Sequence, residues 1–208
     1  MTKAPIFALA TAAVAALVSG CAADGSAPNA MSASSPAAAV ETAAMTAMPA
    51  TVDNFMLADA DFIGHELYRE TGDAKVVVLI TQMNNCPIVR SLAPALRELQ
   101  AKYGPRGVKF IMVNSAVQDS PEEIREEAAE FGITIPILKD THQLVGEQLG
   151  VTRAAEFYVI DPKTWKVAYR GPLDDRLDYG TQKAVAEHPW ASDAIEAVLA
   201  GRPAVAAA

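Results

Sequence analysis

The chain has 208 residues and a formal net charge of −8, a size that suits one ordinary domain with short additions. An acidic chain without a stripe of Lys and Arg binds phosphate backbones poorly, so we expect no nucleic-acid partner. The sequence contains two cysteines, Cys21 and Cys86, and each stands in a context that suggests a different use.

The N-terminus has the layout of a secretory signal. Lys3 is followed by an apolar run from Pro5 to Val18, which is short for a membrane span. The run ends in the letters VSGC, which resemble a bacterial lipobox. We therefore expect residues 1–20 to be a lipoprotein signal peptide, with lipid on Cys21 anchoring the protein to the inner or outer membrane, facing the periplasm. An ordinary signal peptide, cleaved a few residues later, is the alternative.

The rest of the chain divides by composition into three segments. Residues 21–50 are rich in Ala, Ser, Pro, Met and Thr and show no apolar pattern, which predicts a flexible tether. Residues 51–203 carry the periodic apolar patterns of a folded domain. Residues 204–208 are expected to be a disordered tail.

Apolar periodicity predicts an alternation of strands and helices within the folded domain. Such an alternation favours an α/β fold with parallel strands and helices on both faces, and a late hairpin adds an antiparallel edge. The predicted elements are a hairpin in 54–70, strands at 74–81 and 108–115, helices at 87–104 and 119–132, a short strand at 134–140, a short helix at 142–150, a second hairpin at 156–171 and a closing helix at 191–201. This order resembles a thioredoxin-like fold, a central mixed sheet flanked by helices, with an N-terminal β-hairpin extension.

Prolines and caps mark two of these helices. Pro87 suits the first turn of its helix, where the missing N–H costs nothing. Pro94 lies inside the same helical pattern, and we expect it to kink the helix. Ser120 with Glu123 reads as a capping box at the start of the next helix.

Cys86 stands between a buried strand and a helix, beside Asn84, Asn85 and Pro87 rather than core apolar residues. Backbone N–H groups and the positive end of the helix favour the thiolate, which is the nucleophilic form. Reactive groups of α/β folds gather at such junctions, and a free thiol in an exported protein needs a reason. We predict a functional thiol; an inert buried cysteine is the alternative.

Several segments together resemble the peroxiredoxin-like branch of the thioredoxin superfamily, the AhpC/TSA and redoxin group. They are TQMNNCPIVRSLAPALRELQAKYGPRGVKFIMVNS, DSPEEI, ILKD, LGVTRAAEFYVID and YRGPLDDR, and the resemblance spans about 53–203. In that pattern a helix proline follows the first active-site cysteine by eight residues, as Pro94 follows Cys86. The resemblance therefore implies that Cys86 is the attacking cysteine, with an external thiol reductant or a disulfide-bearing protein as its partner.

The chain departs from the family pattern at three positions. Val89 stands where a C-x-x-C motif has its second cysteine, so one chain cannot complete a dithiol cycle. Met83 stands where peroxiredoxins have a threonine, and Thr81 is two positions too early, which argues against fast peroxidase chemistry. Ala155 occupies the position of the family's cis-proline, and we expect a trans peptide bond there because a non-proline cis bond is costly.

The same loop carries two charged residues. The resemblance places Arg153 where it can approach Cys86 and support the thiolate. We expect Glu156 to be a surface charge rather than a proton acceptor. Asp174 and Asp175 are expected to hold a turn or helix cap rather than to take part in catalysis.

These features predict a membrane-tethered thiol redox protein with a single attacking cysteine, a thiol oxidoreductase or a one-cysteine peroxidase or sensor recycled by an external thiol. We expect no cofactor and no bound metal. Two alternatives remain. One is a non-catalytic binding module, and the other is a copper protein that uses Cys86 and Met83, since Cu(I) prefers soft ligands. His65, His142 and His188 show no ligand spacing among themselves.

Overall fold

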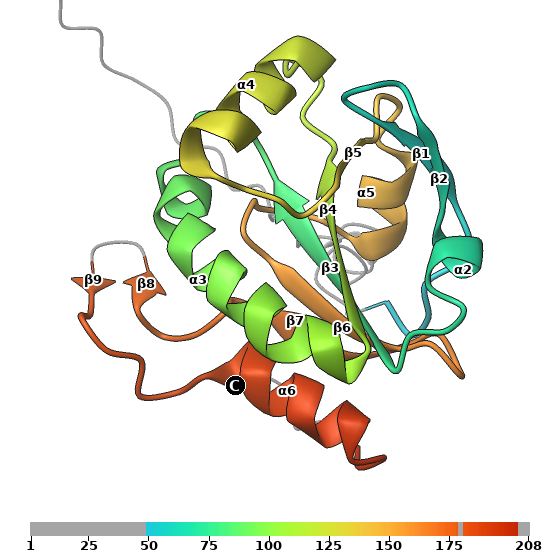
Figure 1. Ribbon diagram of the computed structural model, residues 1–208, viewed down its shortest axis with the longest axis vertical. Helices are drawn as coiled ribbons and strands as arrows, with labels where there is room; N and C mark the ends of the chain where they lie inside the picture. Colours follow the sequence, from blue (N-terminus) through green and yellow to red (C-terminus); the bar gives the residue numbers. More distant parts are fainter. Residues whose placement is uncertain (1–48, 179–180, 204–208) are drawn as a thin grey trace, which may run out of the picture. The chain divides into compact units, whose positions relative to one another are not determined.

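A seven-stranded mixed sheet lies at the centre of the computed structural model, which describes residues 49–178 and 181–203 (Figure 1). The order of strands across the sheet is β2-β1-β5-β4-β3-β6-β7. The strands are β1 (Met56–Asp59), β2 (Gly64–Glu66), β3 (Val76–Gln82), β4 (Val108–Asn114), β5 (Ile137–Lys139), β6 (Phe157–Asp161) and β7 (Lys166–Gly171), and β8 (Leu177–Asp178) pairs with β9 (Thr181–Gln182) in a separate ribbon.

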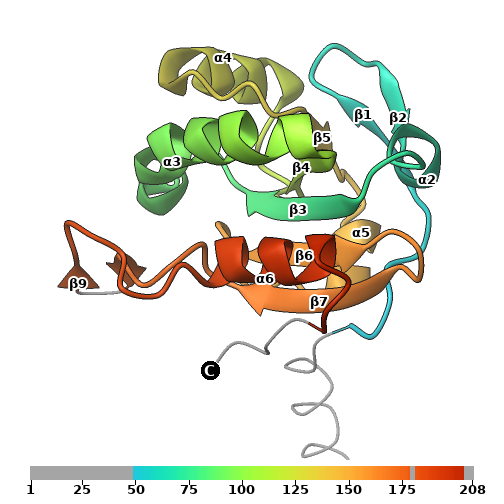
Figure 2. The same cartoon turned by 60° about the horizontal axis from the view of Figure 1, so that its bottom comes forward.

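Helices cover both faces of this sheet. One face packs against α3, α4 and α6, and the other packs against α2 and α5. Figure 2 shows α6 lying over β6 and β7. The helices are α2 (Leu67–Glu70), α3 (Pro87–Tyr103), α4 (Pro121–Phe131), α5 (Leu144–Leu149) and α6 (Trp190–Leu199), with a 3-10 turn η1 (Gly104–Arg106) after α3.

The middle of the sheet is parallel because helices connect its strands. β3 pairs in parallel with β4, and β4 pairs in parallel with β5. Every residue of β3 is buried, as expected for an apolar strand covered on both faces. The carboxyl ends of β3 and β4 therefore meet at one edge, with Gln82 opposite Asn114, and that edge carries the loop that leads to Cys86.

The predicted fold is confirmed, with local differences after the N-terminal hairpin and at the end of α3. The N-terminal hairpin forms as β1 and β2 and joins the sheet by antiparallel pairing with β5, but Leu67–Glu70 turns into a short helix. Ser120 and Glu123 make the capping box. The helix α3 ends at Tyr103 near the predicted Gly104, yet the left-handed residue that turns the chain is Gly107, after η1.

Several predictions concern residues outside the described part of the chain, and one prediction about a described residue, Pro94, is not tested. The signal peptide at 1–20, Cys21, most of the tether and the tail at 204–208 lie outside the described residues. Pro94 lies inside α3, which runs without a break from Pro87 to Tyr103. The kink that we expect at Pro94 stays a prediction.

Candidate functional site

The loop between β3 and α3 places Cys86 at the start of a helix. Asn85 takes a left-handed backbone conformation, with φ of 61°, which Asn tolerates better than most residues. Cys86 is the N-cap of α3 and is extended, and Pro87 occupies the first helical turn as predicted. Cys86 is half-buried and is the only cysteine between residues 49 and 203 in the parts that the structure describes.

Two buried carboxylates hold this loop from the segment that follows β4. The backbone N–H of Asn84 donates to Asp119 at 2.8 Å, and that of Asn85 donates to Glu127 on α4 at 2.7 Å. Asp119 and Glu127 are each only 6% exposed. Sequence reasoning missed both, because the partners lie 35 and 42 residues apart along the chain and no local pattern links them.

A buried polar network continues from Asp119 along the edge of the sheet. Its Oδ2 also accepts a hydrogen bond from Asn114 at 2.7 Å. The side-chain amide of Asn114 also donates a hydrogen bond to Gln82 at 2.6 Å, and the amide of Gln82 donates one to Asn84 at 2.9 Å. Burial lowers the pKa of Lys139, whose ammonium donates to Asn114 at 2.9 Å. Side-chain hydrogen bonds therefore join the carboxyl ends of β3 and β4, in addition to the backbone hydrogen bonds between the two strands. Together they fix the base of the Cys86 loop.

Thr81 fastens the loop that approaches Cys86 from β6. Its hydroxyl donates to the carbonyl of Arg153 at 2.8 Å and accepts the N–H of Glu156 at 2.9 Å. The N–H of Ala155 donates to the carbonyl of Thr81 at 2.8 Å. Ala155 is left-handed, with φ of 61°, and the described residues contain no cis peptide bond, as we expected at this position.

The expectation that Glu156 is a surface charge is wrong. Glu156 is 4% exposed and forms an ion pair with Arg170 of β7 at 2.9 Å. It also accepts a hydrogen bond from the hydroxyl of Tyr158 at 2.9 Å. Burial first of all, together with the Glu156 charge, raises the pKa of Tyr158 far above its usual range. The sequence pattern predicts that a charged residue next to a loop is exposed. Only the pairing of β6 with β7 shows that Arg170 lies on the neighbouring strand, where it can pair with Glu156.

Cys86 opens into a cleft of about 300 Å³ at the amino end of α3. Arg153 also lines this cleft, so the structure brings the two predicted catalytic residues to one site. The side chain of Arg153 is 55% exposed, and its Nε lies 3.9 Å from the carboxylate of Glu156. The remaining walls come from α3, the 152–155 loop and the segment after β7: Met83, Ile88, Leu92, Thr152, Ala154, Ala155, Pro172, Leu173, Asp174 and Leu177. Val89 is 1% exposed and is absent from these walls.

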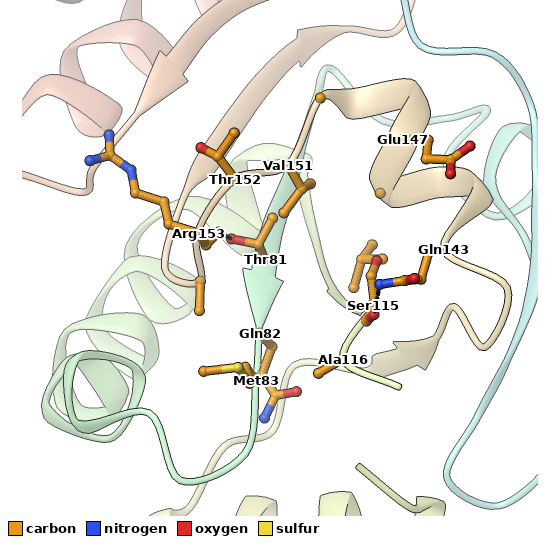
Figure 3. Close-up of a pocket in the computed structure, with 14 residues that line it drawn as sticks. Thr81, Gln82, Met83, Ser115, Ala116, Gln143, Glu147, Val151, Thr152 and Arg153 are labelled. Carbon is orange, nitrogen blue, oxygen red and sulfur yellow. Dashed lines mark hydrogen bonds between the residues drawn. The ribbon is translucent and has the colours of Figure 1, made fainter. Parts of the chain in front are cut away.

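A larger cavity of about 540 Å³ adjoins the Cys86 cleft (Figure 3). It shares Met83 and the stretch 152–154 with the Cys86 cleft, but Cys86 does not line it. Figure 3 shows Gln143 and Ser115 on one wall and Arg153 directed outward at the other. The two cavities therefore form neighbouring depressions at the carboxyl edge of β3.

Acidic side chains near the cleft have structural partners. Asp174 pairs with Arg176 at 2.7 Å, and Asp175 accepts two backbone N–H groups at 2.9 and 3.1 Å, so both hold the turn after β7 as expected. Asp175, Glu187 and His188 lie close enough to suggest a metal site. The ammonium of Lys183 already contacts Asp175 at 2.7 Å and Glu187 at 3.0 Å, so a cation occupies that position.

Comparison with known proteins agrees with this geometry. The model of the AhpC/TSA family matches residues 49–170, and no curated protein matches the chain at a significant level. An uncharacterized conserved protein from Geobacillus kaustophilus is 30% identical, with a TM-score of 0.65, over 76% of this chain and 85% of that one. A hypothetical protein from Sinorhizobium meliloti is 25% identical, with a TM-score of 0.66, over 76% and 87%.

A third structure relates the fold to a named redox protein. Peroxidoxin BcpB from Mycobacterium tuberculosis is 20% identical, with a TM-score of 0.56, and the match covers 75% of this chain and 99% of that one. At that identity the likeness concerns the fold. The family match extends from the N-terminal hairpin to β7 and includes the Cys86 loop and the 153–156 loop, and on this ground the chain belongs to the AhpC/TSA family, a thioredoxin-like redox family.

Proposed function

We propose that the protein is a thiol oxidoreductase in which Cys86 is the single reacting group and an external thiol completes the cycle. The observation that carries the proposal is the place of Cys86, which is half-buried at the first turn of α3 and lines an open cleft. Val89, at the position of a second active-site cysteine, is buried in the core. With Cys21 expected to carry lipid, a second reacting thiol has to come from another molecule.

The proposed reaction with a disulfide conserves atoms and electrons. The Cys86 thiolate attacks one sulfur of the partner's disulfide, a new S–S bond forms, and the partner's other sulfur leaves as a thiolate that takes up a proton. An external thiolate then attacks the partner sulfur of the mixed disulfide, which releases the Cys86 thiolate and leaves the partner joined to the external thiol by a disulfide. A second external thiolate attacks the external sulfur of that bond and releases the second partner thiol, so the partner's disulfide is reduced and two external thiols are oxidised to a disulfide.

Peroxide is the second substrate class open to the same thiol. Attack on one peroxide oxygen breaks the O–O bond and gives a sulfenic acid at Cys86 and hydroxide, and two external thiols then return the cysteine with loss of water. We favour disulfides because Met83 offers no hydroxyl near the thiol. The hydroxyl of Thr81 is engaged with the backbone of Arg153 and Glu156.

We assign Arg153 the supporting role at this site. Its side chain is more than half exposed and lines the same cleft as Cys86. A guanidinium near the sulfur favours the thiolate, because opposite charges attract. Arg153→Gln should therefore slow the reaction of Cys86 with disulfides at neutral pH, without changing the free energy of unfolding by more than about 0.5 kcal/mol.

The direct test treats the reduced full-length protein separately with hydrogen peroxide and with oxidised glutathione. Intact mass and a sulfenic-acid trap identify the products, and Cys86→Ser is the control. We expect a mixed disulfide with glutathione at Cys86 that forms faster than the sulfenic acid. If native Cys86 reacts with neither reagent, while the urea-unfolded protein is modified, the thiol is structural and the proposal fails.

A second candidate function is ligand or partner binding without catalysis. The cavity of about 540 Å³ beside Met83 favours it, because that cavity exists independently of the thiol. A copper site is less well supported, since none of the described residues that line the cleft is a histidine. An alkylation rate of Cys86 no faster than that of a free cysteine peptide would favour the binding module.

We also propose that the protein is exported and held on a membrane by lipid on Cys21, facing the periplasm. The support is the sequence pattern at 1–21, which lies outside the described residues. Among the described helices none is both long and apolar enough to cross a bilayer. Mass spectrometry of the membrane-extracted protein should show acylated Cys21 at the N-terminus, whereas a product that begins after Cys21 would refute the anchor.

A further inference from the structure

The ion pair beneath the Cys86 loop leaves two buried atoms without partners. Arg90 on α3 donates through Nη2 to Oε2 of Glu127 on α4 at 2.7 Å. The same Oε2 accepts the N–H of Asn85 at 2.7 Å. Among the described residues, neither Oε1 of Glu127 nor Nε of Arg90 has a hydrogen-bond partner, and both atoms are buried.

This arrangement is unusual for a guanidinium and a carboxylate. The two groups commonly pair through two parallel hydrogen bonds, which would satisfy both of the orphaned atoms. Here one oxygen serves two donors, and buried polar atoms without partners reduce stability. The pair lacks the second hydrogen bond, while Glu127 keeps its hydrogen bond to the Asn85 peptide. We take this as a sign that Glu127 serves to fix the position of the Asn85 peptide.

Asn85 and Arg90 both act on the neighbourhood of the thiol. Asn85 is the left-handed residue directly before Cys86, and its side chain accepts a hydrogen bond from Arg90 at 2.8 Å. The N–H of Arg90 donates to the carbonyl of Cys86 at 3.1 Å, so Arg90 lies one helical turn from the thiol. The hydrogen bond to Glu127 raises the pKa of Arg90, and an ionised Cys86 acts in the same direction.

We propose that Glu127 is a positioning residue that restrains the ionisation of Cys86. Its carboxylate fixes the Asn85 peptide and neutralises Arg90, the cation in the first turn of α3. Removing the negative charge of Glu127 should also release Arg90 from its ion pair. The loss of the carboxylate charge and the unpaired guanidinium both make the surroundings of the sulfur more positive, which favours the thiolate. The inference deepens the proposed function, since it concerns the reactivity of the same thiol.

Other charged groups face the site from neighbouring elements and remain constant in the test. Arg153 from the 152–155 loop and Asp174 from the segment after β7 line the cleft. Asp119 holds the Asn84 peptide, and Glu130 on α4 acts on Arg90. None of these side chains is changed in the variants below, so a shift reports on the Arg90 and Glu127 pair.

The experiment measures the alkylation rate of Cys86 against pH in the full chain, with iodoacetamide and mass spectrometry of the peptide that contains Cys86. Glu127→Gln keeps an oxygen for Asn85 and loses the charge. We expect its pH midpoint to fall by about half a unit to one unit, with a correspondingly faster reaction at neutral pH. Glu126→Gln, an exposed position on the same helix, should overlay wild type. A midpoint unchanged in Glu127→Gln would overturn the proposal, even if the variant melts at a lower temperature.

A second variant covers the case in which Glu127→Gln does not fold. Arg90→Gln removes the cation from a partly exposed side chain, and its midpoint should rise. An unchanged midpoint in that variant would also overturn the proposal. Alkylation needs neither peroxide nor disulfide, so the result stands even if Cys86 proves to have no redox activity, and the two failures can be told apart.

Discussion

At the scale of single residues, the turn at Ala155 shows how this chain departs from its family. The N–H of Ala155 donates to the carbonyl of Thr81, and the backbone is left-handed. Residues with a side chain adopt this conformation at a cost of about 1 kcal/mol. Proline, which the resemblance would place here, has neither the required φ nor an N–H. The conformation of this loop is therefore incompatible with a proline at position 155.

Restoring proline should disrupt the turn. Ala155→Pro loses the hydrogen bond to Thr81 and demands a φ near −65°, so we expect a loss of about 3 kcal/mol or more in the free energy of unfolding. Ala155→Gly is the matched control and should stay within about 1 kcal/mol of wild type, because glycine adopts the left-handed conformation freely. Urea unfolding measures both. Equal stability of the two variants would contradict this description of the turn.

The hydroxyl of Thr81 should be needed by the same loop. Thr81→Val keeps the shape of the side chain but leaves the N–H of Glu156 and the carbonyl of Arg153 without this partner, and we expect a loss of about 1–3 kcal/mol. Thr81→Ser retains the hydroxyl and should lose less than half as much. The comparison by chemical denaturation separates the hydrogen bonds from the packing of the methyl group.

At the scale of elements, the hairpin of β6 and β7 carries a buried ion pair behind the 153–156 loop. Glu156 and Arg170 have side chains only 5% and 10% exposed. Arg170 also donates to the carbonyl of Gly150 at 2.6 Å. One pair of side chains thus joins the end of α5, the loop and the edge strand, so the position of Arg153 depends on the pairing of β6 with β7.

Breaking this pair should cost far more than breaking a surface pair. Glu156→Ala leaves the Arg170 charge buried without its partner, and we expect a loss of about 3–5 kcal/mol. The surface pair of Arg106 and Glu196 is as close, at 2.6 Å, but its side chains are 44% and 39% exposed. Glu196→Ala should therefore cost less than about 1 kcal/mol. Similar losses in the two variants would contradict the burial of Glu156.

At the scale of the described domain, a histidine ties the N-terminal extension together. His65 on β2 lies 3.0 Å from Asp59 on β1 and 2.9 Å from Glu70 on α2. Burial lowers the pKa of His65, but the hydrogen bonds to Asp59 and Glu70 outweigh burial and raise it above the ordinary 6.5. Both ring nitrogens donate at once only in the protonated form, so protonated His65 links β1, β2 and α2 within the extension.

This raised pKa predicts the sign of a pH effect. The contribution of His65 is fully present below the ordinary pKa and is lost as pH rises through the higher folded value. Between about pH 6 and about pH 8, wild type should therefore lose more free energy of unfolding than His65→Gln. Denaturation at the two pH values measures the difference. Parallel curves for the two proteins would show that His65 is not protonated in the folded state.

How much the sequence predicts depends on the range of the interactions involved. Neighbouring residues correctly predict three local features, namely the apolar strand β3, the capping box of Ser120 and the place of Pro87 in the first turn of α3. The sequence pattern does not predict the turn at Gly107, because a 3-10 segment follows α3. It does not predict the burial of Glu156 either, because the partner, Arg170, lies on another strand.

By itself the sequence determined the fold class, the family and the identity of Cys86 as the thiol at the head of a helix, because periodicity, caps and motif spacing are written in consecutive residues. Only the tertiary structure decided what surrounds that thiol. Asp119 and Glu127 reach the Cys86 loop from the segment after β4, and Arg153 reaches the cleft from the loop before β6. These contacts form when β3 pairs with β4 and β6 in the sheet, and no spacing along the chain encodes them.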